Sequence, residues 1–212
     1  MRGVLRVAVV GCGTAGAAAA LFLSRSGHDV TLLERVPQPG PVGAGIMMQP
    51  SGLLVLERLG LAGHILARGA PVDRLVCETA AGRKILDLRY EALAPGLHGV
   101  GLHRGVLFEA LYHALREPAL GESAVRTRCG VSVERIGQDG DRVAVVDAEG
   151  ARWGPFDLVV VADGARSRVR DAMSSLAKSV RPYAWVRSGS SGATPARSTR
   201  GAFARSSAVH GG

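Results

Sequence analysis

The sequence predicts an α/β fold: a parallel sheet with helices, followed by an antiparallel β-meander and accompanied by a second, incomplete antiparallel sheet. Five of the six residues 5–10 are apolar and three of them are valine. Such a run is typical of a strand buried on both faces of a parallel sheet. It leads into a Gly-x-Gly-x-x-Gly turn and a run of alanine and leucine that favours a helix. Shorter stretches farther along are bounded by turn residues and indicate antiparallel strands.

The glycine turn indicates a Rossmann-like dinucleotide-binding unit. Gly11 permits the tight turn, Gly13 lets a pyrophosphate approach the backbone, and Gly16 lets the helix pack closely on the strand. Residues 28–34 then read as a second strand that ends in Glu34, 18 residues after Gly16. That offset suits a carboxylate that accepts hydrogen bonds from a ribose. The pattern leaves open whether the dinucleotide is FAD or NAD.

The middle of the chain predicts a loop, two helices and a hairpin. Three prolines exclude a helix from the Pro/Gly-rich residues 36–45. A helix that starts at Gln49-Pro50-Ser51 and stops at Gly60 is expected to turn four leucines to the core: Leu53, Leu54, Leu56 and Leu59. A helical turn over 61–68, a hairpin of strands 72–79 and 84–88, and a helix over 106–115 follow.

The last third predicts a β-meander, a buried strand and a tail. Meander strands are expected at 131–136 and 142–147, and a parallel strand at 157–162 leads through Asp163-Gly164 to a helix that starts at Ser167. The residues after 188 are nearly all Ser, Gly, Ala, Arg and Thr, so they cannot bury enough surface to offset their ordering entropy. We expect residues 176–212 to form a disordered Ser/Gly/Arg-rich tail.

The charge and the cysteines exclude several classes of protein. All 18 acidic residues lie at or before Asp171, and six basic residues follow it, so much of the net charge of +8 belongs to the tail. We expect no nucleic-acid partner, because such a face needs clustered basic and aromatic side chains on an ordered surface. We also expect no membrane span and no metal site. Three cysteines without C-x-x-C spacing fit a reducing, cytoplasmic location.

Five segments, in this order, resemble the class A FAD-dependent aromatic monooxygenases, the p-hydroxybenzoate-hydroxylase-like family. The segments are Gly11–Gly16, Glu34-Arg35, Gly43–Leu61, His103-Arg104 with the helix after it, and Asp157–Arg170. Together they cover about residues 5–175. The resemblance implies an FAD-binding Rossmann-like sheet with a β-meander, plus part of an antiparallel substrate sheet. It also implies an NAD(P)H-dependent monooxygenase whose reductant is NADH or NADPH and whose substrate is a small aromatic molecule.

The resemblance also implies roles for individual positions. Residues of the glycine turn would hold the FAD pyrophosphate, Glu34 and Arg35 the ribose, and the backbone of Val133 would meet the adenine. The cofactor-binding residues implied are Gly11, Gly13, Thr14, Ala15, Gly16, Glu34, Arg35, Gly45, Arg104, Val133, Asp163 and Gly164. No catalytic side chain is named, because the hard chemistry belongs to the flavin.

Each of these residues also has a plainer interpretation. Glu34 is then a surface acid at a strand end, Arg104 a solvated residue at a helix start, and Asp163 an N-cap. Met47 and Met48 are expected to fill the core rather than to take part in redox chemistry.

The domains expected are an FAD-binding domain over 1–175, with 71–100 as a partial substrate-sheet insertion, and the tail. Family members continue beyond the Asp-Gly helix, so we expect this chain to be C-terminally truncated, with a tail that resembles out-of-frame translation. The monooxygenase activity is then poor. The alternatives are a non-catalytic FAD-binding remnant and an NAD-dependent dehydrogenase. The substrate and the oligomeric state stay open.

Overall fold

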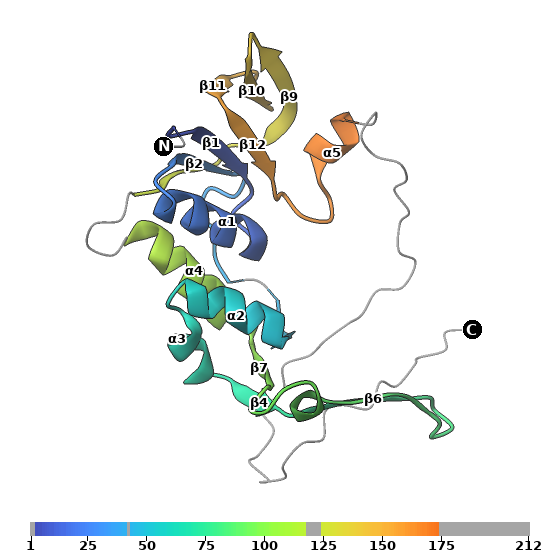
Figure 1. The fold of residues 1–212 in the computed structure, drawn as a ribbon. Helices are drawn as coiled ribbons and strands as arrows, with labels where there is room; N and C mark the ends of the chain where they lie inside the picture. Colours follow the sequence, from blue (N-terminus) through green and yellow to red (C-terminus); the bar gives the residue numbers. More distant parts are fainter. Residues whose placement is uncertain (1–2, 42, 118–123, 174–212) are drawn as a thin grey trace. The chain divides into compact units, whose positions relative to one another are not determined.

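The computed structural model describes residues 3–41, 43–117 and 124–173 (Figure 1). These residues separate into two compact units. Residues 3–41, 105–117 and 124–173 form the first unit, and residues 43–104 form the second. The tail predicted over 176–212 lies outside the described residues.

A four-stranded parallel sheet forms the centre of the first unit. Its strand order is β12-β1-β2-β8. The strands are β1 (Arg6–Val10), β2 (Asp29–Glu34), β8 (Arg126–Cys129) and β12 (Leu158–Val161). The parallel strands predicted from the apolar runs at 5–10, 28–34 and 157–162 are thereby confirmed. Val7, Ala8 and Val9 are fully buried, as expected for a central strand.

Strand β8 has no counterpart in the prediction. Its residues read Arg-Thr-Arg-Cys and contain no apolar run. It forms at the edge of the sheet, where it pairs in parallel with β2 from Thr31 to Glu34. Arg126 makes an ion pair with Asp29 of β2. A strand at the edge of a sheet is less buried than a central strand and can be polar, so a search for apolar runs does not detect it.

The first unit contains α1 (Thr14–Arg25), α5 (Arg168–Ala172) and all but the first residue of α4 (Arg104–Arg116). Helix α1 follows the glycine turn as predicted and buries Ala17, Ala20 and Leu21. Helix α5 begins after Ser167, whose hydroxyl oxygen accepts a hydrogen bond from the Arg170 N–H at 2.9 Å. The N-cap of this helix is therefore Ser167, and the alternative interpretation of Asp163 as an N-cap is wrong. A serine oxygen three residues before the bonded N–H has the required spacing, whereas Asp163 lies too far upstream.

The predicted β-meander is confirmed, and a third strand that had not been predicted joins it, so that the antiparallel sheet has the order β11-β10-β9. Its strands are β9 (Val133–Asp139), β10 (Arg142–Asp147) and β11 (Arg152–Phe156). Asp147 fixes the turn between β10 and β11, since its carboxylate accepts hydrogen bonds from the Ala151 N–H at 2.7 Å and the Trp153 indole N–H at 2.9 Å. The hydrogen bond from Trp153 is the main reason that the pKa of Asp147 lies below its usual value.

A shared core joins the parallel sheet, the meander and α5. The buried members of this cluster are Ala8, Val10, Leu33, Val131, Val133, Val145, Phe156 and Val169. They come from β1, β2, the start of β9, β10, β11 and α5. The carboxyl ends of β1 and β2 are thereby fixed against the start of β9.

The second unit contains a three-stranded sheet and a hairpin, both antiparallel. The elements are β3 (Gly45–Met48), α2 (Pro50–Arg58), α3 (Ala62–Leu66), β4 (Ala70–Val72), β5 (Arg74–Glu78), β6 (Lys84–Arg89), a 3₁₀ turn (Tyr90–Ala92) and β7 (Gly99–His103). Strands β3, β7 and β4 are hydrogen-bonded in that order, and β5 pairs with β6. The hairpin and both helical segments are confirmed, whereas the three strands of the other sheet, β3, β7 and β4, had not been predicted.

The expected core face of α2 needs one correction. Leu56 and Leu59 are buried, but Leu54 is 48% exposed. Residues three apart lie on one face of a helix, so Leu53, Leu56 and Leu59 share a stripe, and Leu54 is turned away from it. Met48 is buried as expected of a core residue. Among the helices of the described residues, none has the length and apolar character needed to cross a membrane.

Candidate functional site

The turn between β1 and α1 requires glycine at its first position. Gly11 has φ of +100°, and a Cβ there would lie 2.6 Å from the carbonyl oxygen of Ala162. Its N–H donates to the Leu33 carbonyl oxygen at 2.8 Å. The chain therefore leaves β1 between the ends of β2 and β12, with no room for a side chain.

The other two glycines differ sharply in their surroundings. A Cβ on Gly16 would lie 1.9 Å from the Gly11 carbonyl oxygen, so this glycine is needed for the turn and the helix to pack together. A Cβ on Gly13 would meet no atom within 4 Å. Gly13 is instead the N-cap of α1, and Thr14 and Ala15 after it are exposed. This open end of the helix presents N–H groups and the positive end of the helix dipole to an anion.

Glu34 is buried beside this turn at the end of β2, with 9% exposure. Its Oε2 accepts a hydrogen bond from the Cys12 N–H at 2.6 Å, and its Oε1 accepts one from the Val36 N–H at 2.8 Å. The interpretation of Glu34 as an ordinary surface acid is therefore wrong. Each carboxylate oxygen keeps capacity for a further hydrogen bond, since it can accept two.

Cys12 lies between Gly11 and Gly13 and is nearly fully buried. Burial raises the pKa of its thiol to about 12, and the negative charge of Glu34 adds to the shift. A thiol in this state is neither a nucleophile nor a metal ligand at neutral pH.

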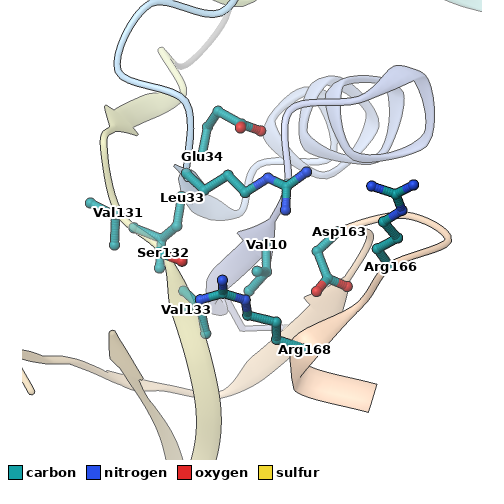
Figure 2. A pocket seen from close by; sticks show the side chains of 11 residues that line it. Val10, Leu33, Glu34, Val131, Ser132, Val133, Asp163, Arg166 and Arg168 are labelled. Atoms are coloured by element: carbon teal, nitrogen blue, oxygen red, sulfur yellow. The ribbon is translucent and has the colours of Figure 1, made fainter. Parts of the chain in front are cut away.

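A small recess with a cavity volume of about 40 Å³ opens between the carboxyl ends of β1 and β2, the start of β9 and the loop after β12 (Figure 2). Its residues are Val10, Gly11, Leu33, Glu34, Arg35, Val131, Ser132, Val133, Asp163, Arg166 and Arg168. Four of them are apolar side chains of the shared core, and five carry charge. The carboxyl edge of a parallel sheet, where the strand order changes direction, is the usual ligand position in such folds.

The charged side chains of the recess are not neutralised by one another. Arg168 makes an ion pair with Glu134 at 3.1 Å. Arg35 and Arg166 are exposed and make no ion pair within the described part of the chain. Gly164, directly after Asp163, has φ of +88°, a conformation that favours glycine.

The structure brings most of the predicted residues together. Five of them line the recess: Gly11, Glu34, Arg35, Val133 and Asp163. Gly13, Thr14, Ala15 and Gly16 continue from the same turn, and Gly164 follows Asp163. Gly45 and Arg104 belong to the second unit, where Gly45 pairs with His103 and the Arg104 N–H donates to the Ala44 carbonyl oxygen at 2.9 Å. These two residues are therefore neighbours of each other.

Sequence reasoning did not assign six residues of the recess: Val10, Leu33, Val131, Ser132, Arg166 and Arg168. Arg166 and Arg168 carried a signal, because two cations directly follow the Asp-Gly pair in a loop that leaves a buried strand. For the apolar residues Val10, Leu33 and Val131, the sequence pattern indicated only that they belong to buried strands.

The arrangement suits a nucleotide with a diphosphate. It combines an open helix N-terminus, a buried carboxylate, an apolar recess and several guanidinium groups. The described residues contain no cluster of His, Cys, Asp and Glu that could hold a metal ion.

Comparison with known proteins agrees with this geometry. A family model described as "FAD binding domain" matches residues 4–187. The 3-hydroxybenzoate 6-hydroxylase of Klebsiella oxytoca is 32% identical over 174 residues, which are 82% of this chain and 43% of that protein. The kynurenine 3-monooxygenase of Salinispora arenicola is 34% identical over 178 residues, 79% of this chain and 38% of that protein.

Solved structures show the same likeness. The tetrameric form of 2-methyl-3-hydroxypyridine-5-carboxylic acid oxygenase has a TM-score of 0.65 at 28% identity, over 81% of this chain and 43% of that one. A variant of HpxO from Klebsiella pneumoniae, solved in complex with FAD, has a TM-score of 0.62 at 26% identity, over 79% and 42%. The chain spans less than half the length of these relatives.

Proposed function

The chain belongs to the FAD-binding domain family, and on that premise we propose that it is the FAD-binding part of an NAD(P)H-dependent aromatic hydroxylase. The observation that carries the proposal is the buried carboxylate of Glu34, held by the Cys12 N–H at 2.6 Å beside an open helix N-terminus. The family match favours FAD over the NAD of a dehydrogenase.

The residues present fit FAD. In this proposal the N–H groups at Gly13, Thr14 and Ala15 bind the pyrophosphate, and the missing side chain of Gly13 leaves space for it. Glu34 accepts hydrogen bonds from the ribose, next to the cation of Arg35.

The other residues inferred to bind the cofactor are Val133, Asp163, Gly164, Gly45 and Arg104. Val133 offers its backbone to the adenine, and Asp163 and Gly164 complete the recess. For Gly45 and Arg104 the proposal rests on the family resemblance, in which Arg104 supplies positive charge to the cofactor.

FAD, when bound, supplies the redox chemistry that links a nicotinamide cofactor, O₂ and an aromatic ring. The side chains of this protein bind and orient the cofactor, and the second unit contributes an antiparallel surface for the substrate. The relatives described above include a 3-hydroxybenzoate 6-hydroxylase and a kynurenine 3-monooxygenase. We therefore propose a small aromatic substrate, with NADH or NADPH as reductant.

We also propose the domain division expected from the sequence: FAD binding over 1–175, with 71–100 in the substrate sheet. A cytoplasmic location, inferred from the cysteine pattern, belongs to the same proposal.

A binding titration tests the function. The purified chain is titrated with FAD, FMN and NADH, and binding is followed by flavin fluorescence and calorimetry. We expect FAD to bind more tightly than either FMN or NADH, because only FAD joins an adenosine diphosphate to a flavin. Tight NADH binding without FAD binding would contradict the proposal.

A turnover assay tests the activity of the chain as given. Hairpin β5–β6 is a two-stranded sheet in the described structure, and Ile85 and Leu86 on it are 64% and 46% exposed. Two strands alone make a marginal structure that does not close a site against water. With FAD, NAD(P)H and a panel of phenols, we expect NAD(P)H consumption to exceed product strongly. A product yield near one per NAD(P)H would refute this expectation.

A further inference from the structure

The first unit contains a second cavity, which is much larger than the recess beside Glu34. Its volume is about 640 Å³, and it is lined by residues of α4, of β8 with the two residues before it, and of the loop after β2. Sites for small organic molecules have volumes in this range. Its described lining residues include none of those inferred to bind FAD. The cavity is therefore large enough for a ligand of its own.

Arg116, at the end of α4, supplies a positive charge to this cavity. Its guanidinium lies over the ring of Tyr112, 5.9 Å from the ring centroid. Within the described ranges Arg116 makes no ion pair, and the adjacent Glu117 is paired with His113 at 3.2 Å. A guanidinium that lies over an aromatic ring still offers the N–H groups at its edge to a carboxylate. The charge of Arg116 is thus available to an anionic ligand.

Tyr112 favours an aromatic ligand. Phe108, one helical turn before it, stacks on its ring with centroids 5.3 Å apart, and Arg116 contacts the ring from one turn after it. These two contacts engage the faces of the Tyr112 ring, so its edge is the part that is left to a ligand. The edge of an aromatic ring is electropositive and prefers the face of a second ring.

The wall formed by β8 adds a hydroxyl and a thiol. Thr127 lines the cavity, and its Oγ1 is buried without a hydrogen-bond partner among the residues that the structure describes. Such a hydroxyl is unfavourable until a partner is supplied. Burial, and then the neighbouring Cys129, raise the pKa of Tyr112. The phenol of Tyr112 is therefore neutral at neutral pH and can donate a hydrogen bond.

We propose that this cavity is a binding site for a small aromatic carboxylate. Arg116 binds the carboxylate, the edge of Tyr112 meets the face of the ring, and the buried Leu115 and Val125 contact the apolar surface of the ligand. The inference does not rest on the proposed function. Every described lining residue belongs to the first unit, whereas the proposed substrate surface belongs to the second, so this is an additional site.

The test is calorimetry on the full chain at fixed ionic strength, with benzoate as the probe. Benzyl alcohol has the ring without the charge, cyclohexanecarboxylate has the charge without the aromatic face, and inorganic phosphate has the charge alone. We expect benzoate to bind most tightly of the four. Its affinity should exceed that of cyclohexanecarboxylate about two- to tenfold, the range expected for an edge-to-face aromatic pair.

Arg116→Gln removes the cation and keeps a polar side chain. It is expected to weaken benzoate binding about fivefold or more, because charge-assisted hydrogen bonds are roughly twice as strong as neutral ones. Binding of benzyl alcohol should change less than about twofold, since that ligand carries no charge. Arg128→Gln is the matched control, because Arg128 is an exposed arginine of β8 that does not line the cavity. Thermal unfolding without ligand checks that both variants fold.

Cys129 reports where the probe binds, because it is half-buried and lines the cavity. The labelling of Cys129 by a thiol reagent is followed in a Cys77→Ser variant by mass spectrometry of the labelled peptide. Benzoate is expected to slow this labelling severalfold, whereas phosphate at the same concentration is expected to leave it unchanged.

Several results would overturn the inference. They are an absence of benzoate binding, equally tight binding of phosphate or cyclohexanecarboxylate, an unchanged benzoate affinity in Arg116→Gln, and an unchanged rate of Cys129 labelling. Bound benzoate that leaves Cys129 unprotected lies at another site. A chain that binds benzoate in the expected way but does not bind FAD would contradict the proposed function and support this inference.

Discussion

The same substitution at two glycines of one turn is expected to have opposite consequences. Alanine at Gly16 places a Cβ 1.9 Å from the Gly11 carbonyl oxygen, whereas real contacts of this kind are essentially never below 3.0 Å. The turn and helix α1 must therefore separate by about 1 Å. Both atoms in conflict are held by backbone, so no side chain can move aside.

The cost of Gly16→Ala follows from this displacement. Overpacking in a tight core costs about 1–3 kcal/mol, and a shift of 1 Å between backbones belongs at the upper end of that range. Alanine in place of glycine inside a helix returns about 1 kcal/mol. We expect the free energy of unfolding to fall by about 2 kcal/mol.

Gly13→Ala is the matched control for the fold. Gly13 has φ of −75°, which alanine adopts without strain, and a Cβ there has no neighbour within 4 Å. The free energy of unfolding should change by less than about 0.5 kcal/mol, as for other surface substitutions. FAD affinity should nevertheless fall about tenfold, because the new methyl group occupies the approach of the pyrophosphate.

The assay is urea unfolding followed by circular dichroism, with FAD titration of both variants by flavin fluorescence. A Gly16→Ala variant as stable as the unaltered chain would refute the packing argument. A Gly13→Ala variant that binds FAD with unchanged affinity would show that the open helix end is not the phosphate site.

Three further predictions concern single side chains. Glu34→Ala removes a charged hydrogen-bond acceptor, and hydrogen bonds to charged groups are worth about 1.5–3 kcal/mol. The affinity for FAD, measured by titration, should therefore fall at least tenfold. An unchanged affinity would exclude a contact between Glu34 and the ribose. With a thiol reagent at pH 8, exposed Cys77 should react quickly and buried Cys12, with its pKa raised to about 12, only after unfolding; fast labelling of Cys12 in a Cys77→Ser variant would contradict this. The pKa of Asp147 is lowered in the folded state, so its contribution to stability is present above the unfolded pKa and disappears as the pH falls through the folded pKa. Urea unfolding at pH 6 and pH 3 measures how far the free energy of unfolding falls on acidification. This fall should be smaller in Asp147→Asn than in the unaltered chain or in the control variant Asp141→Asn. An equal fall in all three proteins would disprove the linkage.

The sequence predicted the structure correctly at positions where the local backbone geometry allows only one type of residue. The spacing of Gly11 and Gly16 predicted a turn whose close contacts the structure shows, and the valine-rich runs predicted the central strands. Glu34 was identified because its position at a strand end is tied to the glycine turn. In each case local chemistry and fold agree.

Elements stabilised by distant partners could not be predicted in the same way. Strand β8 depends on pairing with β2, from which it is separated by most of the first half of the chain. Strands β3 and β7 pair with each other across the intervening α2, α3 and hairpin. The recess is likewise assembled from four separate segments, so the apolar Val131 gave no sign of lining a site, and Arg168 could not be linked to Glu134.

The junction at Gly45 and His103 has a consequence for how the chain can be taken apart. The second unit leaves and returns to the first at neighbouring points, because these two residues are register partners and the Ala44 carbonyl accepts the Arg104 N–H. Backbone pairing thus holds the two ends of this segment together. Loop-closure entropy rises only slowly with length, so modules of different size at this junction would burden the remaining fold to a similar extent. Insertions or deletions between Gly45 and His103 are therefore expected to change the second unit more than the closure of the chain at this junction.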